Sequence, residues 1–147
     1  MRILIVDDDP SLRILLRTTL SGDEFDVEEA SSVEGASELA RFWKPAIVVL
    51  DVGLPGLSGL SWCRELKQNG NSENPTVILL TGADTSAEAA RLAGADALLR
   101  KPFSPLDLVD LIDRHAARKP LSDEEADRVG SDQLLVYARD LSRLLQV

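Results

Sequence analysis

Residues 1–9 read MRILIVDDD, a short apolar run that ends directly in three aspartates. In an open parallel sheet the ligand crevice lies at the carboxyl ends of the strands, so this strand would deliver carboxylates to a ligand site. Crowded carboxylates repel one another unless a proton or a cation joins them. Mg²⁺ suits such a site because it takes one or two protein carboxylates and keeps several waters. The stretch therefore predicts a metal site, with an acidic helix N-cap as the alternative.

The composition limits the classes of protein to which the chain can belong. Its 147 residues suffice for one domain with a sizeable core. A net charge of −9 argues against nucleic-acid binding by this segment, although a further domain could still bind DNA. Cys63 is the single cysteine, which excludes an internal disulfide and fits a reducing compartment. The chain has no signal peptide and no apolar run of transmembrane length, so we expect a cytoplasmic protein without membrane contact.

Short apolar runs alternate with helical patterns as far as about residue 118. The expected strands cover residues 3–6, 25–30, 46–50, 75–80 and 97–99. The expected helices cover residues 10–22, 31–43, 59–67, 86–93 and 105–112, the second opened by a capping box of Ser31 and Glu34. This alternation predicts an α/β fold, a flavodoxin-like doubly wound parallel sheet of order 2-1-3-4-5 flanked by five helices. That order would bring Asp7 and Asp8 next to Asp51, which follows the third strand.

Polar residues follow four of these strands at the point where each strand ends. They are Asp7 with Asp8, Asp51, Thr81 and Lys101. Each has an ordinary explanation by itself, such as a helix cap, a turn residue or a lysine that reaches solvent. Their joint occurrence at one rim of a parallel sheet favours a common site.

Four motifs together relate the chain to a known family. They are the acidic pair Asp7-Asp8, the segment Asp51-Val52-Gly53-Leu54-Pro55-Gly56 followed by Gly59, the strand end Leu80-Thr81-Gly82, and Lys101-Pro102-Phe103. With them the sequence resembles the receiver domain of two-component response regulators over roughly residues 2–118. The resemblance implies a phosphorylation-dependent signalling domain that catalyses only its own phosphorylation and dephosphorylation.

The resemblance also assigns the ligands and the acceptor. Asp51 would accept a phosphoryl group from a sensor histidine kinase. Asp7 and Asp8 would hold Mg²⁺ together with Asp51 and the backbone carbonyl of Gly53. Phosphoryl transfer depends mainly on positioning and charge neutralisation, which these groups can supply. His115 would not be the phosphoryl donor, because that histidine belongs to another protein, and a place at a helix end suits it better.

The remaining implied roles concern the conformational switch. Thr81 would be the switch hydroxyl, and the Lys101 ammonium would pair first with Asp51 and then with a phosphoryl oxygen. The Lys101–Pro102 bond would be cis. Many receivers carry an aromatic residue three positions before the lysine, where this chain has Leu98. Leucine has less reach and no hydroxyl, which puts the usual coupling to the threonine in doubt.

Small residues stand beside the acceptor and the threonine. Gly53 lies two positions after Asp51, and Ala83 lies two positions after Thr81. We hypothesise that the lifetime of the phosphoryl group is therefore set by solvent access and not by side-chain screening.

The sequence changes character near residue 119. Residues 1–119 are expected to form the receiver domain, and residues 120–147 a helical linker or the start of a signalling helix truncated from a longer protein. Within it, Leu134, Ala138, Leu141 and Leu145 follow a heptad spacing. Residues 132–147 would then form a homodimer, or a helix that packs on its own domain, ahead of a C-terminal output domain.

Two alternative functions stay open at this point. A degenerate receiver would act only as a protein-binding scaffold, which the non-aromatic Leu98 favours. A small phosphohydrolase of the haloacid-dehalogenase type would use Asp7 and Asp9 after the first strand, but this hypothesis leaves Asp51 without a role. Cys63 and Trp62, in the third helix, are expected in the core or partly exposed. Trp43, Phe42 and Phe25 are expected in the core or at helix ends.

Overall fold

The computed structural model describes residues 1–22, 24–54, 58–68, 74–82 and 87–117. The chain divides into two compact units, residues 1–103 and 104–147. The expected boundary at residue 119, the linker of residues 120–147 and Ala83 lie outside the described residues.

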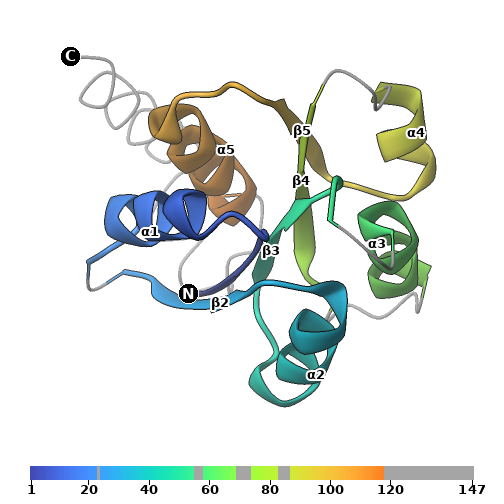
Figure 1. The fold of residues 1–147 in the computed structure, drawn as a ribbon, viewed down its shortest axis with the longest axis horizontal. Helices are drawn as coiled ribbons and strands as arrows, with labels where there is room; N and C mark the ends of the chain where they lie inside the picture. The colour runs from blue at the N-terminus through green and yellow to red at the C-terminus, as the bar shows by residue number, and fades with distance from the viewer. Residues whose placement is uncertain (23, 55–57, 69–73, 83–86, 118–147) are drawn as a thin grey trace, which may run out of the picture. The chain divides into compact units, whose positions relative to one another are not determined.

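The first unit is built on one parallel sheet with the strand order β2-β1-β3-β4-β5 (Figure 1). Its strands are β1 (Arg2–Val6), β2 (Asp26–Ala30), β3 (Ile47–Asp51), β4 (Thr76–Thr81) and β5 (Ala97–Arg100). All neighbouring strands pair in parallel. The predicted fold class, an α/β flavodoxin-like sheet of this order, is confirmed.

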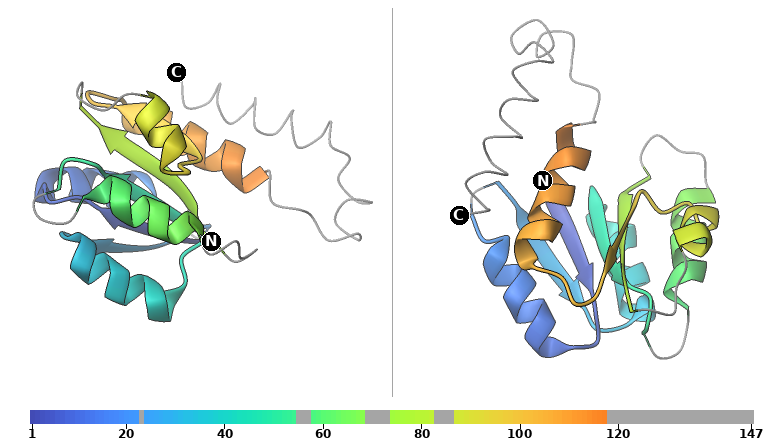
Figure 2. Two further views of the ribbon diagram at one scale, coloured as in Figure 1. Left: turned by 90° about the vertical axis from the view of Figure 1, so that its right-hand side faces the viewer. Right: turned by 90° about the horizontal axis from the view of Figure 1, so that it is seen from above.

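A helix follows each strand along the chain. The helices are α1 (Pro10–Thr19), α2 (Val33–Trp43), α3 (Gly59–Gln68), α4 (Ala87–Leu92) and, in the second unit, α5 (Pro105–Ala117). Residues of α2, α3 and α4 form one hydrophobic cluster with alternate residues of the central strands. Helix α1 lies on the opposite face of the sheet (Figure 2). Each face of the central strands is therefore covered, as expected for a parallel sheet.

Burial of the central strands fixes the register at the sheet's functional edge. Residues 3–6 of β1 and 47–50 of β3 are all fully buried, so a slip by one residue would be costly. Val6 pairs with Leu50, and the next residues along the two strands are Asp7 and Asp51. The apolar pattern thereby places two carboxylates side by side.

The helix starts agree with the sequence in one case and differ in another. Helix α1 begins at Pro10, as predicted, and its N-cap is Asp9, whose carboxylate accepts a hydrogen bond from the backbone N–H of Ser11. The N-cap of α2 is Ser32, so the predicted capping box from Ser31 is wrong. Ser32 has the extended backbone that lets its hydroxyl accept from the Gly35 N–H at 3.1 Å.

Three further expectations concern side chains in helices. Cys63 is fully buried in α3, with its Sγ 3.5 Å from the carbonyl oxygen of Ala93, so its expected place in the core is confirmed. Burial raises the pKa of this thiol to about 11, which leaves it protonated and unreactive. Phe42 is 78% exposed near the end of α2, so it is a helix-end residue and not a core residue. His115 lies in the last turn of α5, with Nδ1 2.8 Å from the carbonyl oxygen of Leu111.

Gly59 lets the start of α3 approach the end of β3. A Cβ atom at this position would lie 2.8 Å from the carbonyl oxygen of Asp51 and 3.2 Å from Cα of Val52. Both neighbours are backbone atoms, so they cannot move aside by a change of rotamer. The glycine thus allows the helix to pack directly against the strand end that carries Asp51.

We predict that Gly59→Ala lowers the free energy of unfolding by about 1–3 kcal/mol, because the added methyl group must displace backbone. Urea denaturation checks this. Gly82→Ala is the matched control, since a Cβ atom there meets nothing within 4 Å. Equal stability of the two variants would contradict the close-approach argument.

Candidate functional site

Three carboxylates meet at the carboxyl edge of the sheet. Asp7 follows β1 directly, Asp51 ends β3, and Asp8 follows Asp7. One oxygen from each lies within 4.8 Å of the others. Asp7 and Asp51 are buried, whereas Asp8 is exposed. The cluster therefore has a buried base and one side open to solvent.

The donor set of this cluster fits a hard divalent cation. All three groups offer carboxylate oxygens, which Mg²⁺ and Ca²⁺ prefer over nitrogen or sulfur ligands. The exposed side at Asp8 leaves room for the waters that Mg²⁺ keeps. The backbone N–H of Gly53 donates to Oδ1 of Asp51 at 2.9 Å, so the segment that follows β3 lies beside the cluster. Coordination by the carbonyl of Gly53 stays a prediction.

Lys101 brings a positive charge to the same place. Its Nζ lies 3.3 Å from Oδ2 of Asp51 and 3.4 Å from Oδ2 of Asp7. The backbone N–H of Lys101 donates to the carbonyl oxygen of Thr81 at 2.7 Å, which ties the chain after β5 to the end of β4. The peptide bond between Lys101 and Pro102 is cis. The lysine thus spans from the edge of the sheet to the carboxylates of its centre.

Burial and the neighbouring charges together raise the pKa of two groups at the site. Burial raises the pKa of Asp7, and the nearby negative charge of Asp51 adds to it against the opposing effects of the Asp9 N–H and Lys101. Burial by itself lowers the pKa of Lys101, but the carboxylates of Asp51 and Asp7 outweigh it and the pKa is raised. Lys101 therefore stays charged at neutral pH, and protons compete with cations at Asp7.

Each oxygen of the Asp51 side chain has a partner that orients it. Oδ1 accepts from the N–H of Gly53, and Oδ2 pairs with Lys101. The side chain is only 8% exposed, so these contacts hold it in one place at the rim. A carboxylate held in this way is oriented for attack on an electrophile that arrives from the open side.

The two expected switch residues lie at neighbouring strands. Thr81 ends β4 and is buried, and its hydroxyl donates to the carbonyl oxygen of Gly82 at 3.1 Å. Leu98 pairs with Leu79 across β4 and β5, and it packs half-buried against the hydrophobic cluster. Thr81 therefore lies at the site, and Leu98 lies on the strand next to it.

Sequence reasoning missed Arg13 and Glu29. Arg13 donates from Nη1 to the carbonyl oxygen of Asp7 at 2.7 Å, and its Nε lies 3.2 Å from Oε1 of Glu29 on β2. Arg17, four residues further along α1, also reaches Glu29 at 3.3 Å. The i, i+4 pair of arginines on the helix after the acidic residues was the available signal.

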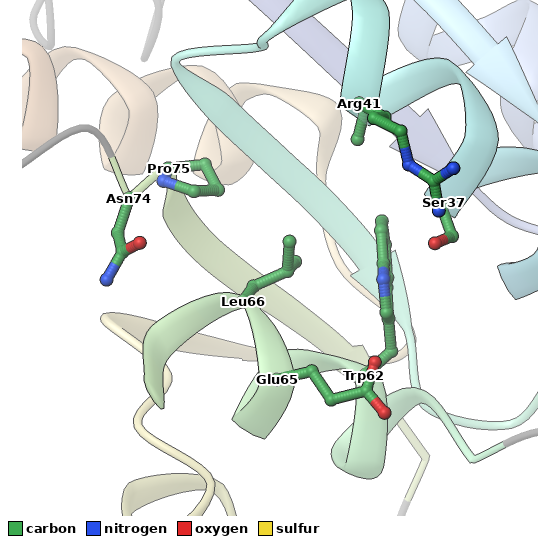
Figure 3. Close-up of a pocket in the computed structure, with 8 residues that line it drawn as sticks. Ser37, Arg41, Trp62, Glu65, Leu66, Asn74 and Pro75 are labelled. Carbon is green, nitrogen blue, oxygen red and sulfur yellow. The ribbon is translucent and has the colours of Figure 1, made fainter. Parts of the chain in front are cut away.

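A separate hollow of about 310 Å³ lies between α2 and α3 (Figure 3). Ser37 and Arg41 of α2 line one side of it, and Trp62 and Glu65 of α3 line the other. None of the residues predicted for the site lines this hollow. The chemistry of the carboxylate cluster therefore does not involve it.

No helix among the described residues combines the length and the apolar character that a membrane span needs.

The fold agrees with comparisons to known proteins. The family model of the response regulator receiver domain matches residues 3–113. The chain is 35% identical to the DNA-binding response regulator MtrA of Mycolicibacterium smegmatis, over 97% of this chain and 62% of MtrA. It is 37% identical to the response regulator MprA of Mycobacterium ulcerans, over 97% of this chain and 60% of MprA. The chain thus spans about three fifths of the length of these relatives.

Solved structures show the same similarity. A receiver domain from Bermanella marisrubri is 35% identical, with a TM-score of 0.71 over 77% of this chain and 95% of that one. The BeF₃-activated N-terminal receiver domain of Klebsiella pneumoniae RstA is 28% identical, with a TM-score of 0.70 over 81% of this chain and 100% of that one. The resemblance noted from the motifs is confirmed, and the chain belongs to the response regulator receiver domain family.

Proposed function

We propose that this receiver domain is a Mg²⁺-dependent phosphoacceptor in which Asp51 takes a phosphoryl group from a sensor histidine kinase. The observation that carries the proposal is the meeting of Asp51 with the acidic pair and with Lys101 at one rim. Mg²⁺ held by Asp7, Asp8 and Asp51 would supply charge neutralisation for the incoming phosphoryl group. A role of the aspartates in helix capping alone would not explain why Lys101 contacts Asp7 and Asp51.

The chemistry is a transfer of one phosphoryl group between two side chains. A carboxylate oxygen of Asp51 attacks phosphorus, and an O–P bond forms as the P–N bond of the kinase's phosphohistidine breaks. The electron pair of that bond returns to the imidazole, which leaves. Lys101 stays protonated and moves its ion pair from Asp51 to a phosphoryl oxygen. Water reverses the modification: its oxygen attacks phosphorus as the O–P bond to Asp51 breaks, which restores the carboxylate and releases inorganic phosphate, with the proton lost to solvent.

The conformational response starts at Thr81. Its hydroxyl now bonds to the carbonyl oxygen of Gly82, and rotation toward the new phosphoryl oxygens would exchange that bond for a charge-assisted one. Leu98 packs against the hydrophobic cluster, where a change of its rotamer can follow this movement. The proposed outcome is a shift in the fourth and fifth elements that is read by a partner or an output domain.

The scope of the proposal extends beyond the described residues. We propose that residues 1–119 form the receiver unit and that residues 120–147 link it to a C-terminal output domain, with a homodimer through residues 132–147. A DNA-binding output is the first candidate, because one relative is named a DNA-binding response regulator. The expectation of no nucleic-acid binding is therefore limited to this segment. A cytoplasmic location follows from the same function.

A scaffold that is never phosphorylated is the second candidate, and Leu98 in place of an aromatic residue is what favours it. The phosphohydrolase hypothesis has no support from the family match, and it leaves the contact between Lys101 and Asp51 unexplained.

Incubation with acetyl phosphate and Mg²⁺ distinguishes the three functions. We expect one added phosphoryl group, mapped to Asp51 by mass spectrometry and lost in Asp51→Asn or when EDTA removes the metal. Asp8→Asn should reduce labelling strongly, because it removes a metal ligand. Asp9→Asn is the matched control: Asp9 caps α1, and asparagine caps helices equally well. No uptake would indicate a scaffold, and a label on Asp7 would indicate a hydrolase.

The lifetime hypothesis is tested at Gly53. A Cβ atom there would lie 3.6 Å from Oδ1 of Asp51, in ordinary contact, and the residue is exposed. Gly53→Leu should therefore shield the phosphoryl group and slow its loss several-fold, with Gly53→Ala intermediate. Decay of the phosphorylated protein after removal of acetyl phosphate measures this. An unchanged decay rate in Gly53→Leu would show that solvent access at this position does not limit the lifetime.

A further inference from the structure

Arg13 connects the acidic pair to two other elements. It is part of α1, it donates from Nη1 to the carbonyl oxygen of Asp7 at 2.7 Å, and it pairs through Nε with Glu29 of β2 at 3.2 Å. Its side chain is only 17% exposed, so the guanidinium is held between these partners. Two hydrogen bonds from different nitrogens of one planar group fix the plane of the guanidinium as well as its position.

The carbonyl that Arg13 holds belongs to the peptide that leads into Asp8. A hydrogen bond to this oxygen fixes the plane of the peptide and, with it, the direction in which the Asp8 side chain leaves the backbone. Asp8 is exposed, and the described residues show no hydrogen bond or ion pair to its carboxylate. Its position therefore depends on the backbone of the turn. The second restraint on this turn is the bond from the Asp9 N–H to Oδ1 of Asp7 at 2.9 Å.

We propose that Arg13, anchored by Glu29, is a positioning residue that holds the turn after β1 so that Asp8 faces the cation. The inference rests on the proposed function, because it takes the acidic pair to be the cation site. Among the described residues, the side chain of Arg13 bonds to the Asp7 carbonyl and to Glu29, and to no carboxylate oxygen of the acidic pair. It acts through the Asp7 carbonyl, in the way that outer partners orient metal ligands elsewhere.

Charge and positioning make opposite predictions for this residue. Arg13 is a cation near three carboxylates, so its removal should strengthen cation binding if only long-range electrostatics mattered. Loss of positioning should weaken cation binding instead. The sign of the change therefore separates the two effects. Arg17 provides the control, because it pairs with the same Glu29 side chain but makes no contact with Asp7.

The test is a titration of the chain with Mg²⁺ by isothermal calorimetry, in the wild type and in three variants. We expect Arg13→Gln to weaken binding about tenfold, as is usual when an outer partner of a metal ligand is lost. Arg13→Lys keeps the charge but cannot hold both partners with one planar group, so it should weaken binding to a smaller extent. Arg17→Gln should leave binding unchanged or slightly stronger.

A second measurement separates positioning from general loss of structure. At saturating Mg²⁺, Arg13→Lys should be labelled on Asp51 by acetyl phosphate at close to the wild-type rate, because excess Mg²⁺ compensates for the weaker binding. Unchanged or tighter Mg²⁺ binding in Arg13→Gln would overturn the proposal. Should that variant fail to fold, wild-type affinity in Arg13→Lys would overturn it equally. Failure of the proposed function is distinct, because the wild type itself would then bind no Mg²⁺ or acquire no label on Asp51.

Discussion

Mutual repulsion among three carboxylates is the constraint on which the site depends. Two like charges at ~4 Å cost about 4 kcal/mol at the dielectric of a protein surface, so three cannot gather without compensation. Lys101 contacts Asp7 and Asp51 and offsets one of the three negative charges. Three carboxylates and one ammonium leave two negative charges, the amount that one divalent cation neutralises. In the proposed function the need for a cation grows further, because the phosphoryl group would bring more negative charge to the same place.

The sheet supplies the rigidity that holds these charges together. Residues 3–6 and 47–50 are buried on both faces, and their pairing places Asp7 beside Asp51. Gly59 lets α3 pack against the backbone of Asp51. The exposed members of the site are held differently. Asp8 depends on its turn, and Arg13 ties that turn to α1 and β2. Burial positions Asp51, whereas polar contacts position the open side of the site.

The strand pattern and the polar residues at the strand ends were sufficient to predict the fold and the meeting of Asp7, Asp8, Asp51 and Lys101. Parallel strands repeat a fixed geometry, so residues that end them share one edge. Arg13 was missed because two arginines four residues apart indicate a charged helix face, but they do not reveal that one of them bonds to a backbone carbonyl. The choice of Ser32 over Ser31 as a cap depends on backbone angles that two adjacent serines do not reveal. Phe42 shows that an apolar residue at a helix end can stay exposed.

The central claim is that these side chains form one cation site around Asp51. Anomalous diffraction from crystals soaked in Mn²⁺, which prefers the same oxygen ligands as Mg²⁺, tests it most directly. We expect one strong peak within bonding distance of carboxylate oxygens from Asp7 or Asp8 and from Asp51, with Lys101 still beside Asp51. A peak elsewhere, or none at Mn²⁺ concentrations that support labelling of Asp51, would contradict this account.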